Sequence, residues 1–155
     1  MNTFNLELEL AHFTSSHFKY SIRVQSSDLD SLEHVNNIVY LKWFLDGAQK
    51  HSDALGYTIE KYMSIGGAFF VKKHQIEYIK PSLLGDDLCL ATYHGEVKGT
   101  SAIRHYRLYR MLPQPGLIAF GETMWVFVDL KSGRPARIPS ELLQTFSDTR
   151  IQNTP

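Results

Sequence analysis

One short segment of the chain contains several side chains of types that are used in catalysis. Within ten residues lie Asp28, Asp30, His34, Asn36 and Asn37. A carboxylate can act as a nucleophile or a general base, and an imidazole can orient water or a carbonyl oxygen. A long apolar run begins directly after the segment. If that run is a helix, its N-terminus supplies partial positive charge and free N–H groups for a developing oxyanion. The arrangement indicates chemistry on a carbonyl group.

The run from Ile38 to Leu55 has helical periodicity, because apolar residues recur at three- and four-residue spacings. Asn36 or Asn37 can cap its start with a side-chain oxygen, and Gly56 is a usual helix stop. Asp46 falls in the middle of the run, and we interpret it as a buried, paired acid. The pattern therefore predicts a long, largely buried helix.

Strands dominate the rest of the chain. Residues 18–25 alternate between apolar and polar types, the period-two pattern of a strand with one buried face. Four more strands are predicted at residues 68–80, 87–97, 100–111 and 117–130, and two short helices at residues 59–63 and 139–146. Alternation in the 100–111 strand places Arg104, Tyr106, Leu108 and Arg110 on one face. Strands joined by short turns form antiparallel sheets, and an apolar helix must be covered by one.

The predicted fold is therefore α+β, an antiparallel β-sheet wrapped around a long central α-helix. No repeat or linker divides the sequence, so we expect a single domain over residues 1–155 with its core at about 17–146.

The overall charge excludes two classes of partner. Sixteen Lys and Arg residues balance sixteen Asp and Glu residues, so no global field attracts nucleic acid or an acidic membrane surface. The first eleven residues have neither the basic region nor the apolar core of a signal peptide. No apolar stretch approaches the roughly 18 residues that a membrane span needs. We therefore expect a cytoplasmic protein that binds neither nucleic acid nor membrane.

The single cysteine and the spacing of the histidines predict neither a disulfide nor a metal site. Cys89 is the only cysteine, and we interpret it as a buried small apolar residue. No two histidines have metal-ligand spacing on one element. His51, His74 and His105 are interpreted as packed or surface residues.

The segment also resembles a known family. Its pattern, Asp28-x-Asp30-x-x-x-His34-Val35-Asn36-Asn37-x-x-Tyr40 followed by Trp43, resembles the signature of hotdog-fold acyl thioesterases. The likeness is greatest to the 4-hydroxybenzoyl-CoA thioesterase-like branch, and the pattern is also similar to plant acyl-ACP thioesterases. Residues 76–86 resemble the family's second strand and turn, and residues 133–139 resemble its closing turn. The resemblance covers most of the chain and implies a hotdog fold.

The resemblance also implies catalytic roles. Asp30 matches the family's catalytic carboxylate, which acts as a nucleophile or as a base that activates water. The backbone N–H of Asn37 matches the donor that polarises the thioester carbonyl. His34 either assists catalysis or holds the turn, and Asp28 is interpreted as structural. Plant acyl-ACP thioesterases commonly have Asn where this chain has Leu32, so no role of that amide is carried over.

Assembly follows from the same resemblance. Members of the family form dimers, often paired into tetramers, with the active site at the subunit interface. A homodimer or a homotetramer is therefore expected.

Several further residues are candidates for binding the substrate: Asn36, Tyr40, Lys72, Arg134 and Arg137. The basic side chains could bind the phosphates of coenzyme A, and Tyr40 could line an acyl pocket. Each also has a simpler interpretation as a helix cap, a core aromatic residue or a solvated surface residue.

The predicted function is an acyl-CoA thioesterase that hydrolyses a thioester to a free acid and CoA. The reaction would depend on Asp30 and need no metal or other cofactor, since coenzyme A is part of the substrate. One alternative is an acyl-ACP thioesterase, whose partner is a small acidic carrier protein. Another is a non-catalytic acyl-CoA-binding module on the same fold. A hydratase, which hotdog folds also include, is a more distant alternative.

Overall fold

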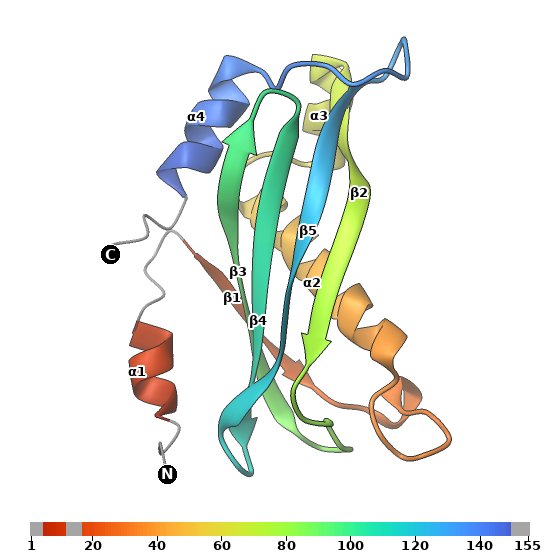
Figure 1. The fold of residues 1–155 in the computed structure, drawn as a ribbon, viewed down its shortest axis with the longest axis vertical. Coiled ribbons are helices and arrows are strands. Elements are labelled where there is room, and N and C mark those ends of the chain that lie inside the picture. The colour runs from red at the N-terminus through yellow and green to blue at the C-terminus, as the bar shows by residue number, and fades with distance from the viewer. Residues whose placement is uncertain (1–4, 12–16, 150–155) are drawn as a thin grey trace.

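The protein folds as a five-stranded antiparallel sheet with one long helix along its inner face (Figure 1). The computed structural model describes residues 5–11 and 17–149. In chain order the elements are α1 (Leu6–Ala11), β1 (Phe18–Arg23), the 3-10 turn η1 (Ser26–Asp28), α2 (Asn37–Ala54), α3 (Ile59–Ile65), β2 (Gly67–Tyr78), β3 (Asp87–Lys98), β4 (Ser101–Leu112), β5 (Gly116–Asp129) and α4 (Ser140–Asp148). The predicted α+β arrangement is confirmed.

The sheet has the strand order β1-β3-β4-β5-β2. The strands β3, β4 and β5 follow one another as hairpins, whereas β2 reaches the far edge and pairs with β5 along its whole length. β2 is 12 residues long, and one of its sides has no neighbouring strand within the described chain. The order therefore leaves a long strand at an edge of the sheet.

The predicted elements lie within a few residues of their expected bounds, but α1 was not predicted. The Glu9 carboxylate of this helix accepts hydrogen bonds from the Arg107 guanidinium at 3.3 Å and from the Tyr109 hydroxyl at 3.1 Å. Both partners are on β4, about a hundred residues later in the chain. Short-range patterns cannot reveal such a contact, which is why the helix has no clear signal in the sequence.

The prediction for Asp46 was half wrong. Its carboxylate lies 3.7 Å from the Lys42 ammonium, one helical turn earlier, so the residue is paired as expected. It is nevertheless exposed, because it lies on the face of α2 that points away from the core. The residues of α2 that are buried near Asp46 are Trp43, Phe44 and Gly47.

A close approach between α2 and the sheet sets the position of the helix. The Phe44 ring stacks on the Tyr106 ring of β4 with a centroid distance of 4.7 Å. Gly121 lies opposite Tyr106 on β5. A Cβ atom at Gly121 would overlap the backbone oxygen of Gln75 on β2 and lie 3.3 Å from the Phe44 ring. The glycine therefore lets the helix and two strands approach one another.

A second cluster of side chains closes the end of the sheet near the C-terminus of α2. Leu142 and Phe146 of α4 pack there with Tyr57 and Phe127. The Phe146 ring also stacks on His94 of β3 at a centroid distance of 4.0 Å. This cluster joins α4 to both the sheet and the segment after α2.

We expect Gly121→Ala to lower the free energy of unfolding by about 1–3 kcal/mol, the usual cost of overpacking a core. The added methyl group meets β2 backbone, which cannot turn aside as a side chain can. Gly116→Ala on the same strand is the control, because its nearest neighbour is the flexible end of Lys80 at 3.9 Å. Chemical denaturation compares the two, and equal losses would contradict the packing argument.

Candidate functional site

The segment between β1 and α2 forms a tight turn around Asp30. The carboxylate oxygen Oδ1 accepts hydrogen bonds from the backbone N–H groups of Leu32 at 2.8 Å and His34 at 3.3 Å. The Asp30 N–H donates in turn to the His34 carbonyl at 2.8 Å. Glu33 takes a left-handed backbone conformation, with φ of 62°, inside this turn. The carboxylate is therefore held by the turn that it helps to form.

Further hydrogen bonds tie the turn to the rest of the protein. The N–H of buried Val35 donates to the Ser82 carbonyl at 3.0 Å. The Asn36 N–H donates to the Asp28 carbonyl at 2.9 Å. The Asp28 carboxylate accepts from the Gln25 N–H, also at 2.9 Å. Asp28 thus has the structural role that was expected.

The helix α2 begins directly after the turn. The Asn36 side-chain oxygen caps it by accepting from the Ile38 N–H at 3.0 Å. The N–H of Asn37, the first helical residue, donates to no residue in the part of the chain that the structure describes. The Asn37 carbonyl accepts from the Tyr78 hydroxyl of β2 at 3.1 Å. The start of α2 therefore offers a free donor at the positive end of the helix dipole.

A carboxylate and a helix N-terminus thus share one loop. The Asp30 oxygen Oδ2 has no hydrogen-bond partner among residues 5–11 and 17–149. Asp30, His34 and Asn37 are all exposed. A free carboxylate oxygen and an N–H donor in one accessible loop suit attack on a carbonyl group, with the N–H stabilising the oxyanion.

The other residues that were predicted to bind substrate lie outside the Asp30 loop. Tyr40 is 3 % exposed, and its hydroxyl accepts from the Ser82 N–H at 3.1 Å, so here it packs in the core. Lys72 is exposed in the middle of β2. Arg134 and Arg137 are exposed between β5 and α4, at the end of the molecule opposite the loop (Figure 1). Within one chain, the structure does not bring these two arginines to Asp30.

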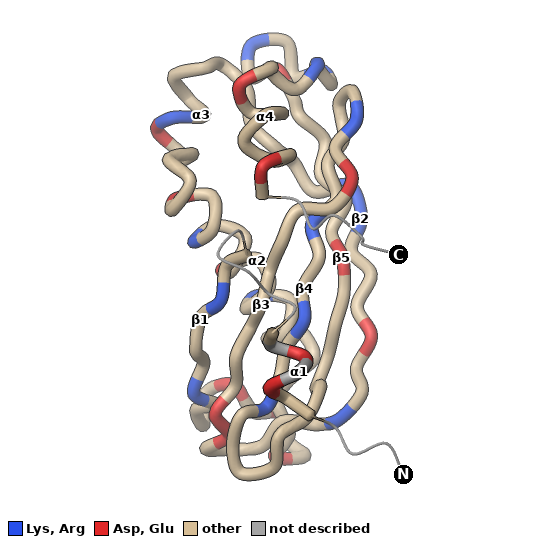
Figure 2. Tube along the Cα trace, turned by 90° about the vertical axis from the view of Figure 1, so that its left-hand side faces the viewer, with Lys and Arg blue, Asp and Glu red and all other residues tan. Residues whose placement is uncertain are grey.

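Charge is mixed over the rest of the molecule. Figure 2 shows Lys and Arg interspersed with Asp and Glu along the trace. His34 is exposed and makes no side-chain hydrogen bond to another described residue, so both of its interpretations stay open. In the described ranges, no three His, Cys, Asp or Glu side chains group as possible metal ligands.

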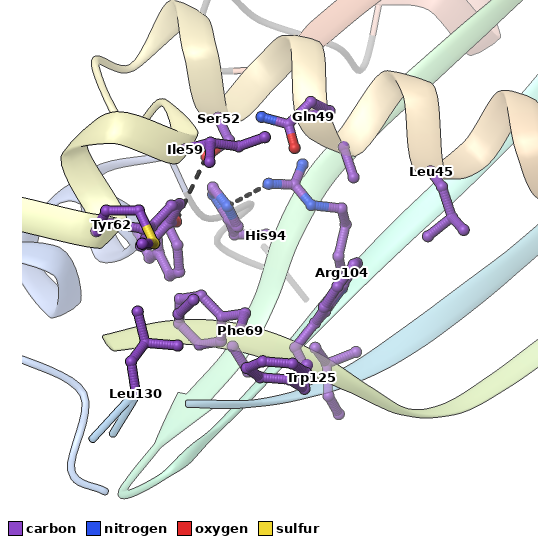
Figure 3. Close-up of a pocket in the computed structure, with 17 residues that line it drawn as sticks. Leu45, Gln49, Ser52, Ile59, Tyr62, Phe69, His94, Arg104, Trp125 and Leu130 are labelled. Carbon is purple, nitrogen blue, oxygen red and sulfur yellow. Dashed lines mark hydrogen bonds between the residues drawn. The ribbon is translucent and has the colours of Figure 1, made fainter. Parts of the chain in front are cut away.

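The structure also contains a cavity that was not predicted from the sequence. It has a volume of about 340 Å³ and lies between α2, α3 and the inner face of the sheet. Figure 3 shows Arg104 of β4 and His94 of β3 reaching into it beside Gln49 of α2. A signal was present in the sequence, because Arg104 shares a strand face with Tyr106 and Leu108, where a charged residue is unusual.

Arg104 is the centre of a buried polar cluster. Its guanidinium donates to His51 Nδ1 at 2.9 Å, to His94 Nε2 at 2.7 Å and to Thr92 Oγ1 at 3.2 Å. Burial, followed by the charge of Arg104, lowers the pKa of His51 to about 3. The same causes hold the pKa of His94 well below its ordinary value. Both histidines are therefore neutral at pH 7.

Comparison with known proteins identifies the family. A sequence profile described as the Thioesterase-like superfamily matches residues 24–146, most of the chain. The chain belongs to the thioesterase-like superfamily. The predicted enzyme class, a thioester hydrolase, is confirmed by this membership.

Relatives of this thioesterase-like protein agree with the assignment. The long-chain acyl-CoA thioesterase FadM of Escherichia coli K12 is 28% identical over 125 residues, which cover 78% of this chain and 90% of FadM. A 1,4-dihydroxy-2-naphthoyl-CoA thioesterase from Synechocystis has a TM-score of 0.77 at 18% identity, covering 85% of this chain and 96% of the other. A Staphylococcus aureus protein in complex with CoA has a TM-score of 0.80 at 16% identity, covering 89% and 88%. These two structures share the fold, and the predicted hotdog fold is confirmed.

We expect Asn36→Ala to lower the free energy of unfolding by about 1 kcal/mol, because the Ile38 N–H loses its cap. Asn36→Asp keeps the acceptor and should retain most of the stability. Asn37→Ala is the control, since no described residue bonds to the Asn37 side chain. Urea denaturation measures all three. A loss at position 37 as large as at position 36 would contradict the capping role.

Acid should destabilise the folded thioesterase through its buried histidines. His51 has a folded-state pKa of about 3, below its ordinary value of 6.5. Between these values the unfolded chain binds a proton that the folded chain does not, so stability falls as the pH falls from about 6.5 toward 3. We expect His51→Gln to make this loss shallower between pH 6.5 and 4.5. The exposed control, His34→Gln, should keep the wild-type slope of urea midpoint against pH.

Proposed function

We propose that the protein hydrolyses acyl-CoA thioesters with Asp30 as the nucleophile or general base. The observation that carries the proposal is a loop in which, among the described residues, one Asp30 oxygen and the first N–H of α2 have no hydrogen-bond partner. FadM, named as a long-chain acyl-CoA thioesterase, and the neighbour in complex with CoA support CoA as the carrier. The proposed reaction needs no metal or other cofactor.

The Asn37 N–H has a direct role in the proposed reaction. When a nucleophile adds to the thioester carbonyl, negative charge develops on the oxygen. A donor already fixed at a helix N-terminus stabilises that charge without reorganising. Loss of one such donor costs on the order of 3 kcal/mol of transition-state stabilisation in hydrolases. The Tyr78 hydroxyl on the Asn37 carbonyl and the Asn36 cap hold this helix end in place.

Two routes are open to Asp30. As a nucleophile, it forms an acyl-carboxylate anhydride and releases the CoA thiolate, and water then hydrolyses the anhydride. As a base, it takes a proton from water while the water oxygen adds to the carbonyl, and the proton passes to the departing thiolate. His34, exposed in the same turn, would orient the water or the carbonyl oxygen.

We further propose that the active unit is at least a homodimer formed through β2. This strand is at the sheet edge, and its Phe70 and Val71 side chains are 54% and 42% exposed. An exposed edge strand with apolar side chains favours pairing with another strand. Pairing of two copies would extend the sheet and bring Lys72 to the interface. It would also offer the Asp30 loop the arginines Arg134 and Arg137 of another copy, to bind the phosphates of CoA.

The location of the protein in the cell is a separate proposal. No helix among the described residues is long and apolar enough to cross a membrane. We propose the cytoplasm, in agreement with the balanced charge and single cysteine of the sequence.

We expect Asp30→Asn to lower thiol release from acyl-CoA at least about a hundredfold, or about 2.7 kcal/mol of activation free energy. Thermal unfolding should barely change, because the amide oxygen can still accept from the Leu32 and His34 N–H groups. The readout is thiol release from a panel of short, long, branched and aromatic acyl-CoAs.

Asp28→Asn is the matched control for this experiment. Its carboxylate also caps a backbone N–H in the same loop, but it has a structural role. We expect it to keep turnover within a few-fold of the wild type. Near-normal turnover in Asp30→Asn would refute the assignment of Asp30.

An acyl-ACP thioesterase is the second candidate. It is favoured by three exposed basic residues close together after β5: Lys131, Arg134 and Arg137. An acidic carrier protein could dock there. Thiol release from the same acyl group on CoA and on carrier protein separates the two carriers. Tight binding of acyl-CoA without thiol release would instead indicate the non-catalytic module.

A further inference from the structure

The guanidinium of Arg104 is buried and has no acidic partner among the residues that the structure describes. Its side chain is only 5% exposed. All sixteen Asp and Glu residues of the sequence lie within the described ranges, and none of them forms an ion pair or hydrogen bond with Arg104. Burying an unpaired charge costs free energy of folding, so a buried charge is expected to have a partner or a ligand.

The neighbours of Arg104 cannot offset its charge. A guanidinium has donors only, so the ring nitrogens that face it, His51 Nδ1 and His94 Nε2, must both be acceptors. The other ring nitrogen of His94, Nδ1, then carries the proton and donates it in a hydrogen bond to the Thr149 hydroxyl oxygen. That hydroxyl in turn reaches the Thr145 carbonyl of α4 at 3.2 Å. The cluster therefore fixes two neutral histidines around a cation, and the site keeps a net positive charge.

Part of the guanidinium is available to a ligand. Of its five N–H donors, three have described acceptors, namely the two imidazoles and Thr92. Arg104 also lines the 340 Å³ cavity. Figure 3 shows its guanidinium inside the cavity beside Gln49, with Ser52 and Tyr62 nearby. A carboxylate is the group that matches a guanidinium with two free donors.

The rest of the cavity suits a hydrocarbon chain. Its other walls are largely apolar and include Leu45, Ala48, Phe69, Ile103 and Trp125. Its rim includes the exposed side chains of Met63 on α3 and Phe70 on β2, so the cavity reaches the β2 edge. An apolar channel that ends on a buried cation matches an aliphatic chain that carries a carboxylate.

We propose that this cavity binds a carboxylate-bearing aliphatic chain, with the carboxylate on Arg104. The proposal rests on the proposed function: the ligand is the far end of the acyl group, and the substrates are ω-carboxyacyl thioesters. Pairing of two antiparallel β2 edges would place the rim of one cavity near the Asp30 loop of the second copy. An ordinary free fatty acid presents the same chemistry, and the test distinguishes the two sources.

The first arm compares hydrolysis of three acyl-CoAs of equal chain length that end in a carboxylate, a methyl ester or a methyl group. We expect kcat/KM for the carboxylate to exceed that for the methyl ester at least tenfold. Arg104→Met should reduce this ratio to about one, and Arg104→Lys should retain part of it. Arg107→Met is the control, because Arg107 is on the same strand but pairs with Glu9 outside the cavity. Its ratio should equal that of the wild type.

The second arm measures binding and does not depend on turnover. Calorimetry with Asp30→Asn follows a free dicarboxylic acid, a fatty acid and the matching fatty alcohol. Binding of either acid at least tenfold tighter than the alcohol supports the carboxylate site, even if no thioester is hydrolysed. A preference for the fatty acid with no preference among the acyl-CoAs assigns the site to free acids. The proposal would be overturned if the acids and the alcohol bind equally and the wild type has equal kcat/KM values for the three acyl-CoAs.

Discussion

The stacking of Phe44 on Tyr106 over Gly121 sets how deeply α2 lies in the sheet. Both candidate functional regions of the molecule adjoin the helix that this contact positions. The N-terminus of α2 meets the Asp30 turn, and its C-terminal half forms a wall of the cavity. A side chain at Gly121 would push the helix outward, because the nearest atoms on the sheet side belong to backbone. Close packing thus positions an N–H donor as well as the cavity.

The Asp30 loop combines a hydrogen-bonded turn with an exposed carboxylate. Each carboxylate has two oxygens, and the turn uses only Oδ1 of Asp30 as an acceptor for backbone N–H groups. The other oxygen accepts no hydrogen bond from a described residue, and in our proposal it is the atom that acts as a base or nucleophile. The anchoring is remote: Val35 bonds to the Ser82 carbonyl, and an ion pair of 2.8 Å between Arg110 and Asp86 braces the segment that contains Ser82. The loop is therefore held by the segment between β2 and β3, which in turn bonds to Arg110 of β4.

Arg104 is a charged residue in the protein core, where apolar residues are usual. A well-packed apolar side chain in its place would avoid the cost of burying a charge. The fold instead surrounds the guanidinium with neutral acceptors and leaves it facing a cavity. Departures from such packing rules inside a fold are expected at functional sites. In our proposal the cavity, rather than any surface feature, therefore selects the substrate.

Local signals in the sequence were enough to predict the fold class and the helix after Asn36. Periodicity predicted α2 and the strands, and the spacing of residue types from Asp28 to Trp43 was enough to indicate the family. Tertiary packing sets which of these side chains are exposed. It buried Tyr40, exposed Asp46 and placed Arg134 far from Asp30 within one chain. It also joined His51, His94 and Arg104, from three separate elements, into one cluster. Such contacts depend on how strands and helices pack across long stretches of sequence, which no local pattern encodes.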